Sequence, residues 1–238
     1  MKVGVAQTRP ATGDIGRNIQ QHKTMIARAI ASGADILIFP ELSLTGYEPS
    51  LAHSLAVDPD DKRLDEFQQI SDKHILTIGA GIPTRSEEGI YISMILFQPG
   101  QPRQVYSKRY LHADEKPFFI EGKNASNRIG GDIALAICYE ISEPQHVEEA
   151  FAGGAKIYIA SVVKIMHGID KAFTRLSEIG SAYAMTVLLS NSVGPADGYE
   201  CAGRSAIWDN KGKLRKQLDM FREGILLLDT ETGKIDAL

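Results

Sequence analysis

The chain alternates short apolar runs with longer amphipathic segments, and this alternation limits the fold more than any other feature. Short apolar runs between turn residues are typical of buried strands, whereas amphipathic segments of three or more turns are typical of helices. Strands that alternate with helices indicate a layered α/β fold. In its first third we expect strands at KVGVAQ, ADILIFP and ILTIGAGI, separated by helices at Asn18–Ser32 and Asp61–Lys73.

The middle of the chain departs from this alternation. The strand-like runs IYISMILFQ and RQVYSKRY are joined by the turn sequence Pro99–Pro102, which predicts an antiparallel pair and therefore a mixed sheet. The remaining expected elements are strands at IALAIC, KIYIAS and VLLSN, helices at Glu143–Gly153 and Asp170–Met185, and hairpin strands RSAIWDNKGKLRKQ and EGILLLDTE around the Asn210–Gly212 turn.

Length and composition are those of one ordinary globular domain. Its 238 residues are 43% hydrophobic and 24% charged, which is close to the average for globular proteins and excludes disorder, collagen and coiled coils. We see no linker, low-complexity segment or short tandem repeat, so we expect a single domain over residues 1–238. The net charge is −4 and the basic residues are scattered, so we expect no nucleic-acid partner.

The start of the chain, MKVGVAQTRP, has no long apolar run of the kind found in a secretory signal. No stretch reaches the roughly 18 apolar residues of a membrane span either. The chain has two cysteines, Cys138 and Cys201, which is fewer than disulfide-dependent secreted domains usually carry. We therefore expect a cytoplasmic protein with free thiols and no membrane partner.

Cys138 stands at the end of the apolar strand in GDIALAICYEISEP. A residue at the carboxyl end of a central strand can project into the crevice where α/β sheets place their sites. The backbone N–H of Tyr139 is then available as an oxyanion donor. The alternative is that Cys138 is a small core residue, which is the commoner role of a buried cysteine. Cys201 follows no apolar strand and is expected to be a loop or packing residue.

A nucleophilic cysteine needs a nearby base or cation, because an unperturbed thiol is mostly protonated at neutral pH. None of the six histidines follows a clear strand, so each is expected at the solvated surface, although a Cys-His pair stays open. Glu41 ends the apolar run ADILIFPE, Lys108 ends a further strand, and Glu115 precedes the pair Phe118–Phe119. Each of these charged residues taken alone could equally be an exposed loop residue.

Taken together and in this chain order, strand-Pro-Glu, strand-Lys and strand-Cys resemble the Glu-Lys-Cys triad of the nitrilase superfamily of carbon–nitrogen hydrolases. The resemblance covers nearly the whole chain, and several separated motifs make it specific. These motifs are VGVAQTRPATGDIGRNI, FPELSLTGY, YSKRYLHADEKPFF, AICYE, SNSVG and GRSAIWDNKGK.

The resemblance implies a four-layer α-β-β-α sandwich with mixed sheets, assembled as a homodimer or a larger homo-oligomer. It also implies that Cys138 is the nucleophile, Glu41 the general base and Lys108 the cation that helps to hold the oxyanion. Glu115 would orient Lys108 and the substrate or water, and the N–H of Tyr139 would be the second oxyanion donor.

Several positions depart from the family pattern. Asp114 competes with Glu115 for the role of second acid, because the interval from the lysine is short here. Gln145 stands where many relatives have an acid. Arg175 and Glu178 lie too early to match a helix motif of the family, so we assign them no family role. The segment Pro195–Gly203 is expected to be a flexible loop, equally compatible with a pocket wall and a plain surface loop.

Tyr139 after the cysteine resembles the amidase-like branches. The expected function is hydrolysis of a non-peptide C–N bond in a small molecule, an amide giving acid and ammonia through a cysteine thioester, without cofactor or metal. His167 and Arg204 are candidate ligands for a substrate carboxylate, or else solvated side chains. The alternatives are an N-carbamoyl amino acid hydrolase, a nitrilase, a thiol hydrolase that uses histidine, and a catalytically silent member that binds a metabolite or partner.

Overall fold

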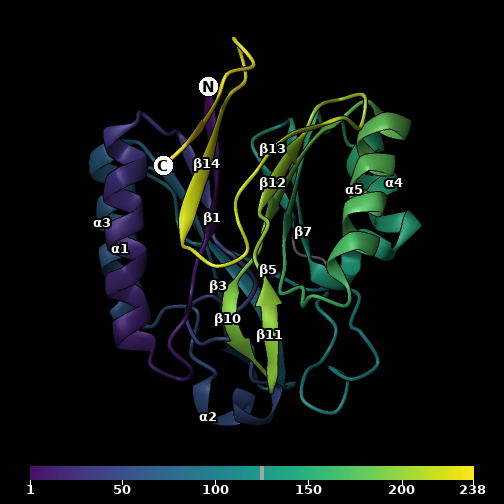
Figure 1. The fold of residues 1–238 in the computed structure, drawn as a ribbon. Coiled ribbons are helices and arrows are strands. Elements are labelled where there is room, and N and C mark those ends of the chain that lie inside the picture. Colours follow the sequence, from purple (N-terminus) through teal and green to yellow (C-terminus); the bar gives the residue numbers. More distant parts are fainter. Residues whose placement is uncertain (124–125) are drawn as a thin grey trace.

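Two β-sheets lie face to face in the middle of the protein, and helices cover the outer face of each sheet (Figure 1). The structure is a computed structural model that describes residues 1–123 and 126–238. Parallel and antiparallel pairs occur in both sheets. The predicted four-layer α-β-β-α sandwich with mixed sheets is confirmed.

The first sheet has seven strands. In chain order they are β1 (Lys2–Gln7), β2 (Ile36–Ile38), β3 (Thr77–Arg85), β4 (Ile90–Phe97), β5 (Gln104–Ser107), β14 (Gly224–Asp229) and β15 (Ile235–Ala237). Their order across the sheet is β15-β14-β1-β2-β3-β4-β5. The parallel strands β1, β2 and β3 form its middle, and β4 and β5 follow as the antiparallel pair predicted from the Pro-Gly-Gln-Pro turn.

The second sheet has six strands, in the order β13-β12-β9-β8-β7-β6. They are β6 (Arg128–Ile129), β7 (Ile133–Ile137), β8 (Ile157–Ser161), β9 (Thr186–Ser190), β12 (Ala206–Trp208) and β13 (Leu214–Gln217). Strands β7, β8 and β9 are parallel, while β6 and β12 are antiparallel additions on either side. The hairpin predicted around Asn210–Gly212 is confirmed as β12 and β13.

The prediction that EGILLLDTE belongs to that same hairpin is wrong. This segment forms β14, which crosses to the first sheet and lies between β1 and β15. Leu226 and Leu228 face the core between the sheets, while Ile225 and Leu227 face the core beneath the helices. A strand that is apolar on both faces needs cover on both sides, whereas all four residues of β13 are exposed at a sheet edge.

Helices α1 (Ile15–Ala31) and α3 (Asp65–His74) cover the first sheet, and α4 (Pro144–Ala152) and α5 (Ile169–Tyr183) cover the second (Figure 1). The shorter helical segments are α2 (Ala52–Leu55), η1 (Pro49–Leu51), η2 (Lys62–Leu64) and η3 (Cys138–Ser142), of which the η segments are 3₁₀ helices.

Helix α1 begins three residues before the predicted Asn18. The Asp14 carboxylate caps the helix by accepting from the Arg17 backbone N–H at 3.0 Å. Asn18 is fully buried one turn inside the helix, where its amide donates to the carbonyl oxygens of Ala11 and Leu44. Asn18, the expected first residue of the helix, therefore ties it to two loops instead.

The alternation of side chains along each central strand divides the apolar residues between two cores. In β2, Ile36 and Ile38 belong to the core between the sheets, whereas Leu37 between them belongs to the core under α1 and α3. Two hydroxyls also join the sheets, because Ser161 donates to the carbonyl of Phe39 at 2.9 Å and Ser190 to that of Ala6 at 2.7 Å. These contacts fix the carboxyl ends of the parallel strands against one another.

The flexible loop predicted at Pro195–Gly203 is instead a hairpin of β10 (Val193–Ala196) and β11 (Tyr199–Ala202). Its turn residues Asp197 and Gly198 both have positive φ, which lets two residues reverse the chain. In Figure 1 this hairpin lies at the bottom of the molecule, at the end opposite to the two termini.

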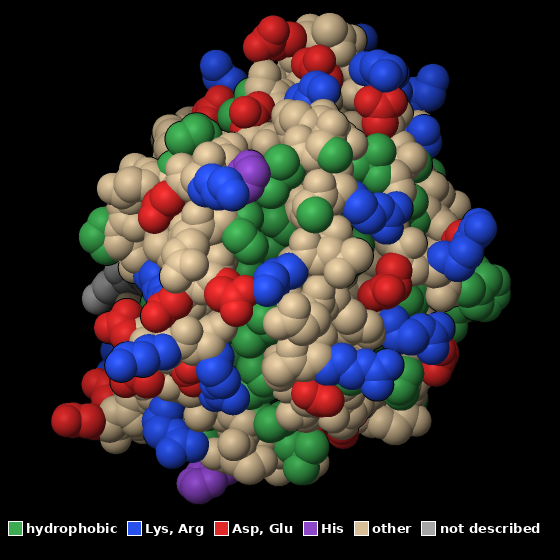
Figure 2. All heavy atoms as spheres, turned by 90° about the vertical axis from the view of Figure 1, so that its left-hand side faces the viewer, with side chains coloured by type: hydrophobic (Ala, Val, Ile, Leu, Met, Phe, Trp, Pro, Cys, Tyr) green, Lys and Arg blue, Asp and Glu red, His purple; other side chains and the backbone are tan. Residues whose placement is uncertain are grey.

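The outer face of α1 and α3 carries interspersed basic and acidic side chains, as Figure 2 shows. This mixture agrees with the scattered charges of the sequence. In the part of the chain that the structure describes, we find no helix with the length and apolar character that crossing a bilayer requires.

Candidate active site

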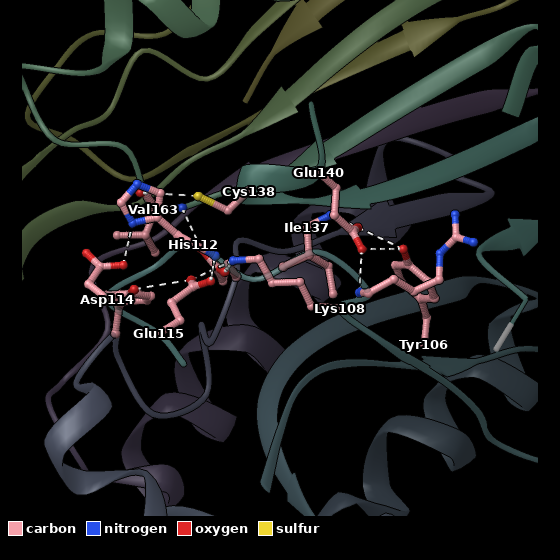
Figure 3. Close-up of polar contacts among 12 residues, drawn as sticks. Tyr106, Lys108, His112, Asp114, Glu115, Ile137, Cys138, Glu140 and Val163 are labelled. Carbon is pink, nitrogen blue, oxygen red and sulfur yellow. Dashed lines mark hydrogen bonds and ion pairs between the residues drawn. The ribbon is translucent and has the colours of Figure 1, made fainter. Parts of the chain in front are cut away.

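Cys138 directly follows β7 and begins η3. Its φ is +45°, a left-handed conformation that costs a residue with a side chain about 1 kcal/mol or more. The sharp bend ends the strand and turns the sulfur toward the carboxyl ends of the neighbouring strands. There the thiol lies 3.8 Å from the carbonyl oxygen of Val163, as Figure 3 shows.

Glu41 reaches the same place from the segment after β2, and its side chain is fully buried. Its backbone packs directly on Gly81 of β3, where a Cβ would come within 2.6 Å of the Pro40 carbonyl oxygen. Only glycine allows this close approach. One carboxylate oxygen of Glu41 accepts from the backbone N–H of Val163 at 3.2 Å. The backbone of Val163 thus contacts the Glu41 carboxylate through its N–H and the Cys138 sulfur through its carbonyl, which places the two side chains near each other.

Lys108 follows β5 and is completely buried. Its ammonium nitrogen lies 2.8 Å from a carboxylate oxygen of Glu41 and 2.6 Å from one of Glu115. Gly122 packs against Ser107 so closely that a Cβ would lie 2.3 Å from the Ser107 carbonyl oxygen. The Gly122 N–H also donates to the Lys108 carbonyl at 2.7 Å, which fixes the backbone from which the lysine extends.

Glu115, rather than Asp114, is the acid that reaches the lysine. Its second oxygen accepts from the His112 backbone N–H at 2.8 Å, and the Tyr47 hydroxyl donates to its first oxygen at 3.2 Å. Asp114 is exposed and binds the His112 ring instead. The structure therefore places the neighbouring acid outside the buried cluster (Figure 3).

The charges in this cluster shift one another's proton affinities. Burial raises the pKa of the Glu41 carboxyl, and Lys108 offsets part of that rise. Burial by itself would lower the pKa of Lys108, but the charges of Glu41, Cys138 and Glu115 outweigh it and the pKa is raised. Lys108 therefore stays an ammonium group, and Glu41 has a greater affinity for a proton than an exposed glutamate.

Burial and the Glu41 charge raise the pKa of the Cys138 thiol to about 11, while Lys164 and Lys108 lower it. The resting sulfur is therefore a thiol at neutral pH. It needs a proton acceptor during attack, and Glu41 is the adjacent carboxylate.

The sulfur opens into a pocket of about 320 Å³. The pocket walls come from the segments after β7 and β8 and from the β10–β11 turn. Part of the segment Pro195–Gly203 therefore lines the pocket. The lining includes Tyr47, His112, Tyr139, Lys164, His167 and Tyr199. Tyr139, predicted as an oxyanion donor, thus lies at the pocket beside Cys138.

Arg175, Glu178, Arg204 and Cys201 are not among the residues that line this pocket. Arg175 donates to the Ile141 carbonyl at 2.8 Å and pairs weakly with Glu178, which supports η3 from outside. Arg204 pairs with Asp170 at 2.7 Å, so its guanidinium is already engaged. Cys201 is buried in β11, which agrees with a packing role.

The expectation that every histidine lies at the solvated surface is wrong. His22 and His146 are buried, and burial lowers the pKa of each to about 4. His22 stacks on Phe39 with ring centroids 4.0 Å apart, so it serves as a core residue. His112 and His167 line the pocket, as the open alternative of a Cys-His pair requires, although the thiol itself contacts the Val163 carbonyl.

Sequence analysis missed Glu140, which is fully buried two residues after the nucleophile candidate. Its carboxylate accepts from the backbone N–H groups of Ile137 and Arg109, each at 2.7 Å, and from the Tyr106 hydroxyl at 2.7 Å (Figure 3). One side chain therefore joins the backbone before Cys138 to the backbone after Lys108. The signal in the sequence was an acid in an otherwise apolar stretch, because a buried carboxylate needs donors.

The sequence predicted that the loop from Lys164 to Asp170 shapes the pocket, but it gave no role to Val163 or to the Lys164 side chain itself. Strand β8 is the parallel neighbour of β7, so its carboxyl end lies at the same sheet edge as Cys138. Over residues 1–123 and 126–238 the structure has no cluster of three or more His, Cys, Asp and Glu side chains suited to a metal ion.

Comparison with known proteins gives a consistent result. A family model described as carbon-nitrogen hydrolase matches residues 2–238. The glutamine-dependent NAD(+) synthetase of Acinetobacter baylyi is 27% identical over an alignment of 237 positions that covers 93% of this chain and 42% of the synthetase. The synthetase of Thermotoga maritima is 26% identical over an alignment of 243 positions that covers 97% of this chain and 42% of that protein. The chain thus spans less than half the length of these curated relatives.

Among solved structures, the amidase from Nesterenkonia sp. AN1 superposes with a TM-score of 0.86 at 23% identity, covering 96% of this chain and 92% of the amidase. This likeness shows the same fold. Because the family model spans almost every residue, the chain belongs to the carbon-nitrogen hydrolase family.

Proposed function

We propose that this protein hydrolyses the C–N bond of a small amide, releasing an acid and ammonia, with Cys138 as nucleophile. The observation that carries the proposal is the buried Lys108 ammonium, held at 2.8 Å from Glu41 and 2.6 Å from Glu115 beside a cysteine that opens into a pocket. A base, a cation and a nucleophile in one enclosed site are the parts that acyl transfer through a covalent intermediate requires.

In the first half of the proposed reaction, the Cys138 sulfur attacks the amide carbonyl carbon while Glu41 accepts the thiol proton. The new C–S bond leaves a tetrahedral oxyanion, which the Lys108 ammonium and the Tyr139 N–H stabilise. Glu41 then returns the proton to the leaving nitrogen, the C–N bond breaks, and ammonia departs. The product is a thioester on Cys138.

In the second half, Glu41 takes a proton from a water molecule that attacks the thioester carbonyl. The oxyanion forms again at the same donors, the C–S bond breaks, and the sulfur regains its proton from Glu41 as the acid leaves. Glu115 keeps Lys108 in place throughout. Its two oxygens are fixed by the lysine and by the His112 N–H, so it acts as a positioning residue.

Two further observations support an amide as the substrate. A pocket of about 320 Å³ suits a small molecule. A cysteine-to-alanine variant of the Nesterenkonia amidase has been solved in complex with butyramide, and acrylamide adds to the active-site cysteine of that enzyme. The curated relatives are named for their dependence on glutamine, which also carries a side-chain amide.

The test is ammonia release from short aliphatic amides, glutamine, dicarboxylic acid monoamides, N-carbamoyl amino acids and simple nitriles. We expect turnover of an amide group, lost by roughly 10⁴-fold or more in Cys138→Ala and retained in the matched control Cys201→Ala. Turnover of nitriles or carbamoyl compounds alone would correct the substrate class. Silence across the panel would favour the catalytically silent binder.

A further inference from the structure

Lys164 stands directly after the residue that contacts both Glu41 and Cys138, and its backbone is held on both sides. Its N–H donates to the Asn191 side-chain oxygen at 2.8 Å, and its carbonyl accepts from the Asn191 amide at 3.1 Å. The Ala202 N–H donates to the same carbonyl at 2.8 Å. Three hydrogen bonds therefore hold the backbone of Lys164 in place.

The Lys164 side chain lines the same pocket as the Cys138 sulfur. Among residues 1–123 and 126–238, no carboxylate oxygen lies within 4.0 Å of its ammonium group. The pKa of Lys164 is raised, first by the charge of Cys138.

The two lysines near the sulfur differ in how their charge is used. Lys108 lies between two carboxylates at 2.8 and 2.6 Å, so most of its charge is already balanced. Lys164 has no such ion pair, and of the two ammonium groups it lowers the pKa of Cys138 more. Glu41 and Glu115 act in the opposite sense on that thiol.

We propose that Lys164 is a second catalytic cation, which holds the Cys138 sulfur as a thiolate at the moment of attack. This inference rests on the proposed function, in which Cys138 is the nucleophile. The S–H bond breaks, its proton passes to Glu41, and the sulfur lone pair that remains forms the C–S bond. With Lys164 facing the sulfur, the Lys108 ammonium is left to stabilise the carbonyl oxygen.

The test is the rate at which iodoacetamide alkylates Cys138 as a function of pH, followed by peptide mass mapping. The proteins compared are the wild type, Lys164→Met, Lys164→Arg and the matched control Lys171→Met, a lysine of α5 that lines the adjoining hollow. We expect Lys164→Met to react about tenfold or more slowly at pH 8, since one pKa unit changes the thiolate fraction tenfold. Lys164→Arg should restore most of the rate, and Lys171→Met should match the wild type.

The groups around the sulfur and its pocket that also titrate or carry charge are Glu41, Tyr47, Lys108, His112, Asp114, Glu115, Tyr139, His167, Asp197 and Tyr199. They are the same in every protein compared, so the difference between variants isolates Lys164. If Lys164→Met does not fold, the alkylation rate of Lys164→Gln is compared with that of the wild type instead. The melting temperature of each protein shows whether it is folded.

An unchanged alkylation profile in Lys164→Met would overturn the inference. So would a variant with normal thiol reactivity whose KM rises only for amides bearing a carboxylate, because Lys164 would then be a substrate ligand. Failure of the proposed function looks different. In that case Cys138 of the wild type would be alkylated no faster than Cys201.

Discussion

Two buried polar clusters flank the backbone around Cys138, and they use their carboxylates in opposite ways. The charged cluster is Glu41, Lys108 and Glu115, in which carboxylate oxygens meet a buried ammonium group. The supporting cluster is Tyr106, Glu140, His146 and Tyr158, in which the carboxylate meets two backbone N–H groups and a hydroxyl. Both are buried, yet only the first borders the pocket, through Glu115 and the adjacent sulfur of Cys138.

Two chain segments run from one of these regions to the other. Tyr106 and Lys108 lie two residues apart at the end of β5, and Cys138 and Glu140 lie two residues apart after β7. Figure 3 shows Lys108 reaching away from the Glu140–Tyr106 contact toward Glu115. The charged cluster therefore has the ionised groups that the proposed proton transfer needs, while the supporting cluster hydrogen-bonds to the backbone beside Lys108 and the backbone before Cys138.

Among the substitutions that test the contrast between the two clusters, Lys108→Met is expected to have the largest effect. The substitution removes the proposed oxyanion cation and leaves Glu41 and Glu115 as buried like charges, so kcat/KM should fall by roughly 10²- to 10³-fold or more. Stability should also fall by about 3 kcal/mol or more, since an uncompensated buried charge is costly. Steady-state kinetics and urea unfolding measure the two effects.

Lys123→Met is the matched control for Lys108→Met, because Lys123 is exposed and pairs with Glu88 only at the surface. It should leave both quantities near the wild-type values. Activity of Lys108→Met within tenfold of the wild type would show that the charged cluster is structural, and the contrast between the clusters would disappear.

Glu140→Gln should have an intermediate effect. The amide nitrogen that replaces one carboxylate oxygen would face a backbone N–H, so the link between Ile137 and Arg109 is lost on one side. A small displacement of Cys138 from Lys108 should lower kcat by roughly 10- to 100-fold with little change in KM. A variant with full activity would contradict the positioning role.

The same variant should change how stability depends on pH. Burial raises the pKa of Glu140 from its usual 4.5 to about 7. Between these values the unfolded chain has lost the proton that the folded chain still binds, so wild-type stability falls as pH rises through this window. Glutamine does not titrate, and the stability of Glu140→Gln relative to wild type should therefore increase by up to about 3 kcal/mol from pH 4.5 to 7. Urea midpoints at both pH values measure this, and a constant difference would argue against the shifted carboxyl.

The smallest effect is expected from Tyr158→Phe at the far side of the supporting cluster. The Tyr158 hydroxyl contacts the His146 ring nitrogen at 2.9 Å, and its loss leaves that buried nitrogen unpaired. We expect a loss of about 1–2 kcal/mol of stability and activity within about twofold of wild type. Tyr91→Phe, which removes a surface hydroxyl bound to Glu88, is the control and should be near neutral. A large loss of activity in Tyr158→Phe would contradict this expectation, because it would show that the supporting cluster also controls the reaction.

Most of the fold could be predicted from local pattern, because strand and helix periods are written into neighbouring residues. The strands that precede Glu41, Lys108 and Cys138 were expected within three residues of their observed ends. The structure brings these three residues and Glu115 together, while their catalytic roles stay predictions. The sheet to which β14 belongs could not be predicted, since its pairing with β1 joins segments more than 200 residues apart in the sequence.

The sequence by itself determined the layered α/β class, the separated Glu, Lys and Cys motifs, and their positions after apolar strands. Only the tertiary structure decided that Glu115 rather than Asp114 meets Lys108, that Glu140 joins the backbones next to Lys108 and Cys138, and that Lys164 lines the pocket with Cys138. The physical reason is that periodicity and turn chemistry act between near neighbours. The partner of a buried charge is set by which distant segments the packed sheets bring within hydrogen-bonding distance.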